Sequence, residues 1–407
     1  MDASSYVQDI EASRPQATAG GDATAGPPVV IPLARAAPAL RLLGMPRVTD
    51  IVDATYHALH GRDRAVSIAV LEHARHAAPP PPDFLAGEID SALAEQMYGA
   101  SVAEPVSCIA IEGGYVGPTC IAISGTTALF SELSMHPAHH VRRVVDGLLG
   151  PDLPVRHIAG KLALIYGPAH QTWGHWICDF LPRLHVLARA GHDLSTLRYV
   201  VPPDLKPFEA QLLQAVGIPP ERLVRYAYGR EILRADVVLV PSGFRTDDCL
   251  NAGFADATRA WINGLGIAMD NAQATEKLFI SRAGAPGERV VINRSVIEAL
   301  AKARGYRIVY PETVDVAAQL SLFASASVII GEYGSALHNT VFAPAGAKIC
   351  ALRGTSRHPG FVQTSLCAAL GQKIGYVFGD TRSQNVEQRF RIEPQFFERA
   401  LTWLDLP

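Results

Sequence analysis

A histidine and an aspartate four residues apart, His175 and Asp179, have the types and the spacing for acid–base chemistry. Side chains at positions i and i+4 of a helix share one face. At the mouth of a cleft, either group can take a proton from an attacking hydroxyl and act as a general base. The structural alternative is that Asp179 pairs with Arg183, also four residues away, and that His175 is a satisfied core histidine.

A second segment carries residue types that hold phosphates. Ser281 and Arg282 follow a short apolar run, and Arg289 comes close behind. An arginine at the end of a strand can bind a phosphate through two parallel hydrogen bonds. An ordinary surface arginine is the other interpretation of Arg282.

The third segment is a glycine turn that runs from Gly331 to Asn339. If a helix starts at Gly334-Ser335, its free backbone N–H groups favour a diphosphate there. His338 could add a hydrogen-bond donor, and Glu332 could accept from sugar or ribose hydroxyls. A purely structural turn remains the alternative. The turn lacks the third glycine of a dinucleotide fingerprint, and the chain has no GxxxxGK[ST] loop.

No metal or other bound cofactor is expected. The spacing of His170, His175 and Asp179 does not match the patterns that make zinc sites specific, and the histidine cluster at 136–140 fits no better.

The elements around these segments follow the order of a parallel, doubly wound α/β domain. They are a strand from Lys277 to Ile280, a helix from Asn293 to Arg304, a strand from Tyr306 to Tyr310, a helix from Val314 to Ser325, and a strand from Ser327 to Ile330. Ligands of such sheets bind beyond the carboxyl ends of the strands, where Arg282 and the glycine turn fall.

The remaining elements are shorter or less regular. Helices are expected at Thr49 to His60, Asp83 to Tyr98, up to about Ala190, Phe208 to Val216, Ala255 to Leu265 and Pro394 to Leu404. Strands are expected at Val106 to Ile111, Cys120 to Ser124, Ala128 to Leu133, Leu162 to Tyr166, Tyr199 to Val201 and Asp236 to Val240.

These elements predict four parts: a disordered tail at 1–28, an N-terminal lobe at 29–270, a C-terminal lobe at 271–390 and a closing helix at 391–407. The chain has 407 residues, of which 48% are apolar and 18% charged, so it can bury a sizeable core. Its net charge of −3 argues against bulk binding of nucleic acid.

The localisation expected from the sequence is cytoplasmic. The six cysteines are scattered and are expected to be reduced core thiols. The first fifteen residues carry acidic side chains and no apolar run, so no signal peptide is expected, and no stretch is long enough to span a membrane. A peripheral contact with the inner face of the membrane stays open.

Taken together, the motifs resemble glycosyltransferase family 61, whose bacterial members are often labelled capsular polysaccharide biosynthesis proteins. The resemblance runs in order over about residues 105–355. It is carried by His175-Trp176-x-x-Asp179-x-Leu181-Pro182-Arg183-Leu184, Ile280-Ser281-Arg282, Arg289 to Asn293, Pro311-Glu312, and Gly331-x-x-Gly334-Ser335-Ala336-Leu337-x-Asn339. Many relatives have His where this chain has Tyr333.

The resemblance implies a GT-B-like fold of two Rossmann-like lobes that face a cleft, with extra β-strands in the N-terminal part. It implies an inverting transferase that needs no metal, with a nucleotide-sugar donor, UDP-sugar first, in the C-terminal lobe. A glycan, lipid-linked or other hydroxyl acceptor would sit on the N-terminal side, in surface or extracellular polysaccharide synthesis.

Carried over residue by residue, the resemblance makes Asp179 the first choice of base and His175 the second. Its implied donor-binding residues are Ser281, Arg282, Arg289, Glu332, Gly334, Ser335, His338 and Asn339. Two other functions remain: a nucleotide-sugar epimerase of the same architecture, and a non-catalytic binding protein descended from a transferase. The oligomeric state is open.

Overall fold

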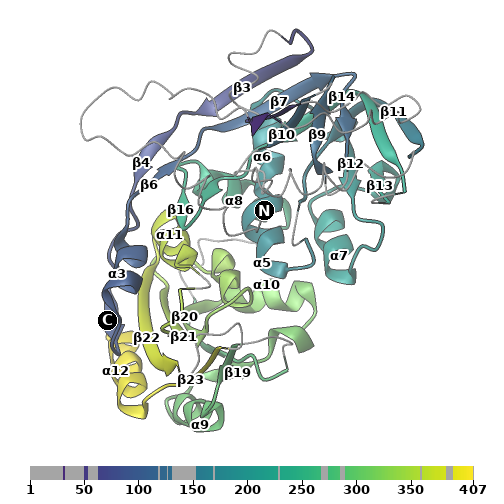
Figure 1. The fold of residues 1–407 in the computed structure, drawn as a ribbon. Coiled ribbons are helices and arrows are strands. Elements are labelled where there is room, and N and C mark those ends of the chain that lie inside the picture. The colour runs from purple at the N-terminus through teal and green to yellow at the C-terminus, as the bar shows by residue number, and fades with distance from the viewer. Residues whose placement is uncertain are drawn as a thin grey trace.

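The structure is a computed structural model in which two β-sheets and the helices between and around them form the folded body (Figure 1). It describes residues 31–32, 50–53, 63–117, 120–125, 127–130, 153–167, 170–227, 230–266, 274–284, 289–357, 360–381 and 388–406. The tail expected at 1–28 and most of the connection expected at 266–274 lie outside these residues.

The second sheet of the chain is the doubly wound sheet expected from the sequence. Its parallel strands lie in the order β19-β17-β20-β21-β22, and their bounds are β17 Glu276–Ile280, β19 Arg307–Val309, β20 Ala326–Glu332, β21 Lys348–Gly354 and β22 Lys373–Thr381. Beside β22 run β23 (Gln388–Arg391), which is antiparallel to it, and then β18 (Arg289–Val291).

Helices cover both faces of this sheet because its strands are apolar on both sides. Leu278 and Ile280 of β17 face the main core, whereas Phe279 between them faces a smaller core. On the smaller core lie α9 (Arg294–Ala303) and α12 (Pro394–Asp405), and on the main core lie α10 (Val316–Ala324), η7 (Leu337–Phe342) and α11 (Val362–Ala369), nearer the first sheet (Figure 1).

The strand order reverses at one position of this sheet. From β17 the chain moves to β19 through α9, and it then returns to the other side of β17 as β20 through α10. The connections that leave β17 and β20 therefore go to opposite faces of the sheet. Such a reversal of strand order leaves a crevice beyond the carboxyl ends of the two strands, where ligands of open α/β sheets bind.

The first sheet is mixed. Its parallel part has the order β14-β11-β12-β13, formed by β14 Ile232–Pro241, β11 Val155–Ala163, β12 Arg198–Val201 and β13 Leu223–Arg225. Antiparallel strands continue the sheet on the other side of β14, either paired with it or further out. They are β3 Val66–Glu72, β7 Val106–Glu112, β8 Tyr115–Val116, β9 Ala122–Ser124 and β10 Thr127–Phe130. These are the extra strands expected in the N-terminal part.

The helices of the first half are α5 Trp173–His175, the π-helical turn η3 Trp176–Phe180, α6 Pro182–Arg189, α7 Pro207–Ala215 and α8 Phe254–Gly264. Shorter elements are β1 Ile31–Pro32, β2 Asp50–Asp53, β4 Arg75–Ala77, β6 Ser101–Ala103, β15 Arg245–Thr246 and β16 Cys249–Leu250, with single 3₁₀ turns at Leu194–Thr196, Pro220–Arg222 and Pro311–Thr313.

Two expected helices are wrong in part. Asp50–Asp53, expected inside a helix from Thr49 to His60, is strand β2 and pairs parallel with β10. Its Ile51-Val52 pair is β-branched and suits a paired strand better than a helix. The helix expected from Asp83 to Tyr98 is α3 (Ser91–Tyr98) only.

The missing first turns of that helix form strand β5 (Phe84–Ala86), which joins the second sheet beside β22. Gly87 follows in a left-handed conformation, with φ of +93°, and ends the strand. The N-terminal lobe expected at 29–270 therefore contributes one of its strands, β5, to the second sheet. The chain leaves the first sheet after β3, contributes β5, and returns as β7.

All six cysteines lie buried as free thiols, as expected. Within the described residues, no helix is long and apolar enough to cross a membrane.

The close contact between β17 and β20 predicts the effect of a single methyl group. A Cβ at Gly331 would lie 2.6 Å from Ile280 Cβ and 2.7 Å from the Ile280 carbonyl oxygen, so Gly331→Ala must push the two strands apart. We expect it to lower the free energy of unfolding by about 1–3 kcal/mol in urea titration. Gly264→Ala is the matched control, because a Cβ at the end of α8 meets nothing within 4 Å. Equal stability of both variants would contradict the packing described here.

Candidate active site

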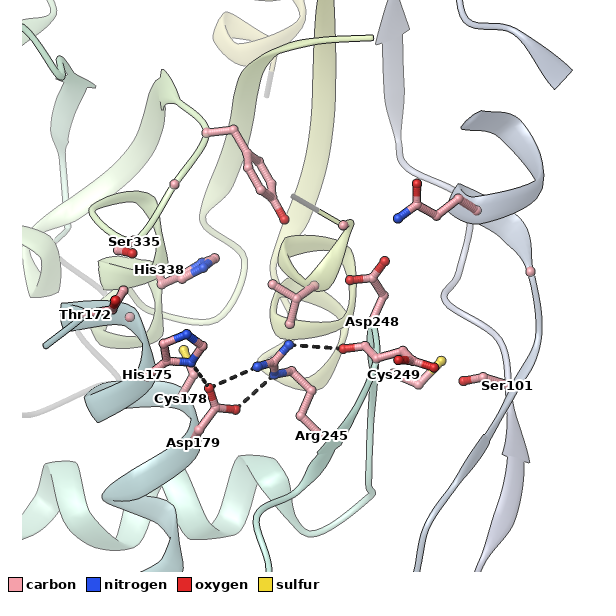
Figure 2. Close-up of a pocket in the computed structure, with 18 of the residues that line it drawn as sticks. Ser101, Thr172, His175, Cys178, Asp179, Arg245, Asp248, Cys249, Ser335 and His338 are labelled. Atoms are coloured by element: carbon pink, nitrogen blue, oxygen red, sulfur yellow. Dashed lines mark hydrogen bonds and ion pairs between the residues drawn. The ribbon is translucent and has the colours of Figure 1, made fainter. Parts of the chain in front are cut away.

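A cavity of about 710 Å³ lies where the two halves of the structure meet (Figure 2). Segments far apart in the sequence line it, and the lining residues fall within 95–101, 172–179, 245–249, 333–338 and 360–362. His175 and Asp179, expected to do chemistry, are therefore in the same cavity as the glycine turn after β20.

A buried carboxylate organises this cavity. Asp179 Oδ2 accepts a hydrogen bond of 2.6 Å from His175 Nδ1, and the guanidinium of Arg245 donates from Nε to Oδ1 at 2.9 Å and from Nη2 to Oδ2 at 3.1 Å. An ionised carboxylate only accepts hydrogen bonds, so the imidazole hydrogen is on Nδ1. His175 Nε2 then carries the free lone pair.

A π-helical turn places Asp179. The N–H of Leu181 donates to the carbonyl of Trp176, five residues back, at 2.9 Å. Pro182 follows and has no N–H to give to the carbonyl of Cys178, so the regular ladder cannot continue through this turn. The wider turn is a known local device of functional sites, and here it contains the carboxylate that holds His175.

The charge balance keeps Asp179 ionised. Burial alone would raise the pKa of Asp179, but the positive charge of Arg245 and the hydrogen bonds from His175 and Arg245 hold it well below its usual range. Arg183 does not replace Arg245 in this role, because its Nε and Nη2 have no hydrogen-bond partner and its guanidinium lies over the Phe180 ring. Local pairing of Asp179 with Arg183, the structural alternative, is therefore not what the structure shows.

Arg245 reaches Asp179 from the hairpin of β15 and β16. The turn residue Asp247 has a φ of +52°, which is costly for a residue with a side chain. Its carbonyl oxygen accepts from Arg245 Nη1 at 3.2 Å, so the turn itself fixes the guanidinium. Strain of this kind persists where surrounding contacts impose it and is common at functional sites.

The catalytic segment and the glycine turn touch directly. A Cβ on Gly174 would lie 2.7 Å from His338 Cδ2 and 3.2 Å from Ser335, so only glycine fits without movement. Trp173 Nε1 donates to Asn339 Oδ1 at 2.6 Å, which ties the two segments together beside that contact. Asn339 is fully buried and bonds to another protein segment, so its expected place among the donor-binding residues stays a prediction.

His338 lines the cavity with a ring that is held from behind. Its Nδ1 lies 3.0 Å from Gln363 Oε1, while Gln363 Nε2 donates to Thr340 Oγ1. Burial lowers the pKa of His338 to about 4, so the ring is neutral at pH 7. With its hydrogen on Nδ1 given to Gln363, Nε2 can only accept. The expected role of His338 as a donor to a phosphate does not fit this tautomer.

The crevice at the carboxyl ends of β17 and β20 holds the arginine expected to bind phosphate. Arg282 is half-buried, and its Nε is buried with no hydrogen-bond partner among the described residues. Burial lowers its pKa, and Glu332 opposes that shift. A buried guanidinium N–H without a protein partner can donate to a ligand atom.

Both carboxylate oxygens of Glu332 accept hydrogen bonds from within the protein. Its Oε1 and Oε2 accept from Arg294 Nε at 2.5 Å and Arg294 Nη2 at 2.8 Å, and Oε1 also accepts from the N–H of Arg282 at 3.2 Å. Glu332 therefore fixes the side chain of Arg294 beside Arg282, and its expected role as an acceptor from sugar or ribose hydroxyls stays a prediction.

The expected residues divide into two groups. His175, Asp179, Gly334, Ser335 and His338 line the cavity. The rest do not: Ser281, Arg282 and Glu332 belong to the adjacent crevice, Asn339 is in the core, and the side chain of Arg289 is outside the described part of the structure.

Sequence reasoning missed Arg245, Asp248 and Glu95 at the cavity and Arg294 at the crevice. A signal existed for Arg245, since it comes shortly after the strand expected at Asp236 to Val240 and so lies near a carboxyl end. Nothing in the sequence indicated that α3 reaches the cavity.

The described residues contain no group of three or more His, Cys, Asp or Glu side chains placed to hold a metal ion. His170, one of the ligands considered, faces Glu209 instead, with Nδ1 3.2 Å from Oε1. The histidines at 136–140 lie outside the described residues.

A doubly wound sheet whose strand order reverses beside a cavity with a histidine–carboxylate pair is an arrangement typical of enzymes. The family model of Glycosyltransferase 61 matches residues 173–350, from the start of α5 into β21. This match supports the assignment to glycosyltransferase family 61, and with it a glycosyltransferase. A comparison with curated proteins finds no match.

The ion pair of Asp179 predicts a pH-dependent loss of stability when Arg245 is removed. A carboxylate with a lowered pKa stabilises the fold above the pKa of the unfolded chain, and that stability is lost as the pH falls through the folded value. In Arg245→Met, no guanidinium offsets the cost of burying the Asp179 charge, so we expect the variant to be about 3 kcal/mol less stable at pH 7. The deficit should shrink at pH 5, as Asp179 takes up a proton.

Urea titrations at the two pH values measure this effect. Arg189→Met is the matched control, because Arg189 is 40% exposed in its pair with Glu72 and its loss should cost at most about 1 kcal/mol. A deficit of equal size at pH 7 and pH 5 would show that the pair with Asp179 is not its cause.

Proposed function

We propose that this glycosyltransferase moves a sugar from a nucleotide-sugar donor, first a UDP-sugar, to a hydroxyl of a glycan acceptor with inversion at the anomeric carbon. One observation carries the proposal. The crevice of the doubly wound sheet, with the unpaired Nε of Arg282, adjoins a cavity in which a carboxylate holds an imidazole with a free lone pair.

The two halves fit the roles of donor and acceptor sides in a GT-B arrangement. In this proposal the nucleotide lies over the carboxyl ends of β17 and β20, with its diphosphate between Arg282 and the Gly334-Ser335 turn. The donor sugar then extends into the cavity toward His175. The helix after the turn is η7, a 3₁₀ helix of six residues that begins at Leu337. Because it is so short, we propose that Arg282 and the Ser335 hydroxyl stabilise the diphosphate more than the helix dipole does.

His175 is the base in this mechanism, and Asp179 positions it. The lone pair on His175 Nε2 takes the proton of the acceptor hydroxyl as that oxygen forms its bond to the anomeric carbon. The bond from that carbon to the diphosphate oxygen breaks at the same time, and its electron pair leaves with the nucleoside diphosphate. Asp179, ionised and hydrogen-bonded to Nδ1, stabilises the imidazolium that forms.

This assignment reverses the order expected from the resemblance, in which Asp179 was the first choice of base and His175 the second. Asp179 gives both oxygens to Arg245 and His175, and its low pKa makes it a weak proton acceptor. The charge on the leaving diphosphate is met by Arg282, so the proposal needs no metal ion. In this proposal the enzyme takes part in the synthesis of surface or extracellular polysaccharide, and it works in the cytoplasm or at the inner face of the membrane.

Nucleotide binding tests the donor site. We expect calorimetry to show binding of UDP that EDTA does not change, and Arg282→Ala to weaken it at least about tenfold, because a charge-assisted contact is lost. Arg259→Ala, which changes an arginine of the exposed face of α8, is the control. Binding that EDTA abolishes would refute the metal-free donor site. Epimerised sugar nucleotide from donor alone would favour an epimerase.

Catalysis tests the base. We expect His175→Ala to lower kcat by about 10²–10⁴-fold, measured as UDP release from a UDP-sugar with a pool of acceptors, because proton transfer is lost. His157→Ala is the control, since that ring is 55% exposed on the first sheet.

Asp179→Asn should also lower kcat, since the amide cannot stabilise the imidazolium. Full activity in His175→Ala together with inactive Asp179→Asn would return the role of base to Asp179. Full activity in both variants would refute this mechanism.

A further inference from the structure

Two histidine rings in the cavity lining can accept hydrogen bonds from a ligand. The imidazoles of His175 and His338 both use Nδ1 inside the protein, on Asp179 and Gln363, which leaves each Nε2 as an acceptor. Two rings on different segments thus present lone pairs to one cavity. This observation is independent of the carboxylates described next.

Three carboxylates form a second part of the lining, which we call the acidic wall: Glu95 of α3, and Asp247 and Asp248 of the β15–β16 turn. Figure 2 shows Asp248 across the cavity from His175. Among the described residues, no ion pair joins any of the three to a basic side chain. Ionised carboxylates accept hydrogen bonds and donate none. Burial raises the pKa of Asp248, and the Phe361 N–H and the charges of Arg245 and Arg353 oppose that shift.

Asp248 is held in its place by the chain around it. A Cβ on Gly360 would lie 2.2 Å from Asp248 Oδ1, so the loop before α11 can approach only because residue 360 is glycine. The N–H of Phe361 bonds to the carboxylate, and Ser365 Oγ donates to the Asp248 carbonyl at 2.5 Å. The acidic wall therefore has at least one fixed member.

The lining holds fewer positive than negative side chains. Among the described residues around the cavity, Arg245 is the only Lys or Arg, and its guanidinium is used by Asp179 and by the carbonyl of Asp247. The cation Arg282 belongs to the crevice and does not line the cavity. A carboxylate or phosphate on a ligand would meet like charge here, whereas hydroxyl or ammonium groups would meet acceptors.

We infer that the acceptor of this enzyme enters the cavity as an uncharged or amino-bearing sugar, that its hydroxyl or ammonium groups donate to the acidic wall and to His338 Nε2, and that anionic sugars are rejected. The inference rests on the proposed function, and it names the substrate class of the same site. It also explains how the donor is oriented, because the acidic wall repels the diphosphate toward Arg282.

Three small sugars that differ only at carbon 6 test the inference: methyl β-glucoside, its 6-amino-6-deoxy analogue and methyl β-glucuronide. Saturation-transfer NMR titration of the full chain, without any donor, gives their relative affinities. We expect the glucuronide to bind at least about tenfold more weakly than the amino sugar at low salt, with the glucoside between them. The difference should shrink at 0.5 M NaCl, since salt screens charges.

Variants assign the effect to the acidic wall. Glu95→Gln and Asp248→Asn, alone and together, should bring the affinities of the amino sugar and the glucuronide closer. Asp256→Asn removes the same charge from the exposed face of α8 and should leave the ratio unchanged. Thermal unfolding checks that each variant is folded, and the amide replacements keep the size of the side chain.

Equal or tighter binding of the glucuronide would overturn the inference, and so would the absence of binding by all three sugars. A change of the ratio in Asp256→Asn as large as in Asp248→Asn would overturn the assignment to the acidic wall. These titrations involve no donor and no turnover. A preference for the uncharged and amino sugars without any UDP binding would therefore refute the proposed transferase and leave the charge selectivity standing.

Discussion

The structure depends on one buried charge, the carboxylate of Asp179. It is made tolerable by a guanidinium that arrives 66 residues later in the chain and by an imidazole one turn before it. Each of the three groups would be costly alone in this place, because burial without a partner disfavours charge. Together they fix the tautomer of His175, so the requirement for electrical balance and the requirement for a base are met by the same contacts.

A second constraint is the contact between the two halves of the structure. Residues of both sheets belong to one continuous hydrophobic core, and a separate smaller core lies on the far face of the second sheet. At the cavity the contact is closer still, since Gly174 touches His338 and Trp173 bonds to Asn339. The distance between the base and the glycine turn is therefore set by packing and does not depend on a flexible connection.

The elements that could be predicted from the sequence are those with a regular local pattern of apolar residues. The alternation from Lys277 onward was visible because buried parallel strands are apolar throughout and the intervening helices are periodic. The sequence could not predict β5, whose neighbour Asp83 bonds to Ile374, 291 residues away, nor the pairing of Asp179 with Arg245. Spacing found His175 and Asp179, but only three-dimensional contacts show that one holds the other. The contacts of Glu332, His338 and Asn339 could not be predicted, because their partners are distant in the chain.

Strand β5 also determines which pieces of this chain can be made separately. It pairs with Gly375 to Val377 of β22, at an edge that β23 covers only further along, at Asp380 and Thr381. A recombinant fragment that began at β17 would leave that stretch of backbone N–H and C=O groups without a neighbour. Bare edges of this kind pair with other chains and drive aggregation. A soluble fragment of the second sheet would have to carry the segment around Phe84 with it, joined by a linker or supplied as a separate peptide.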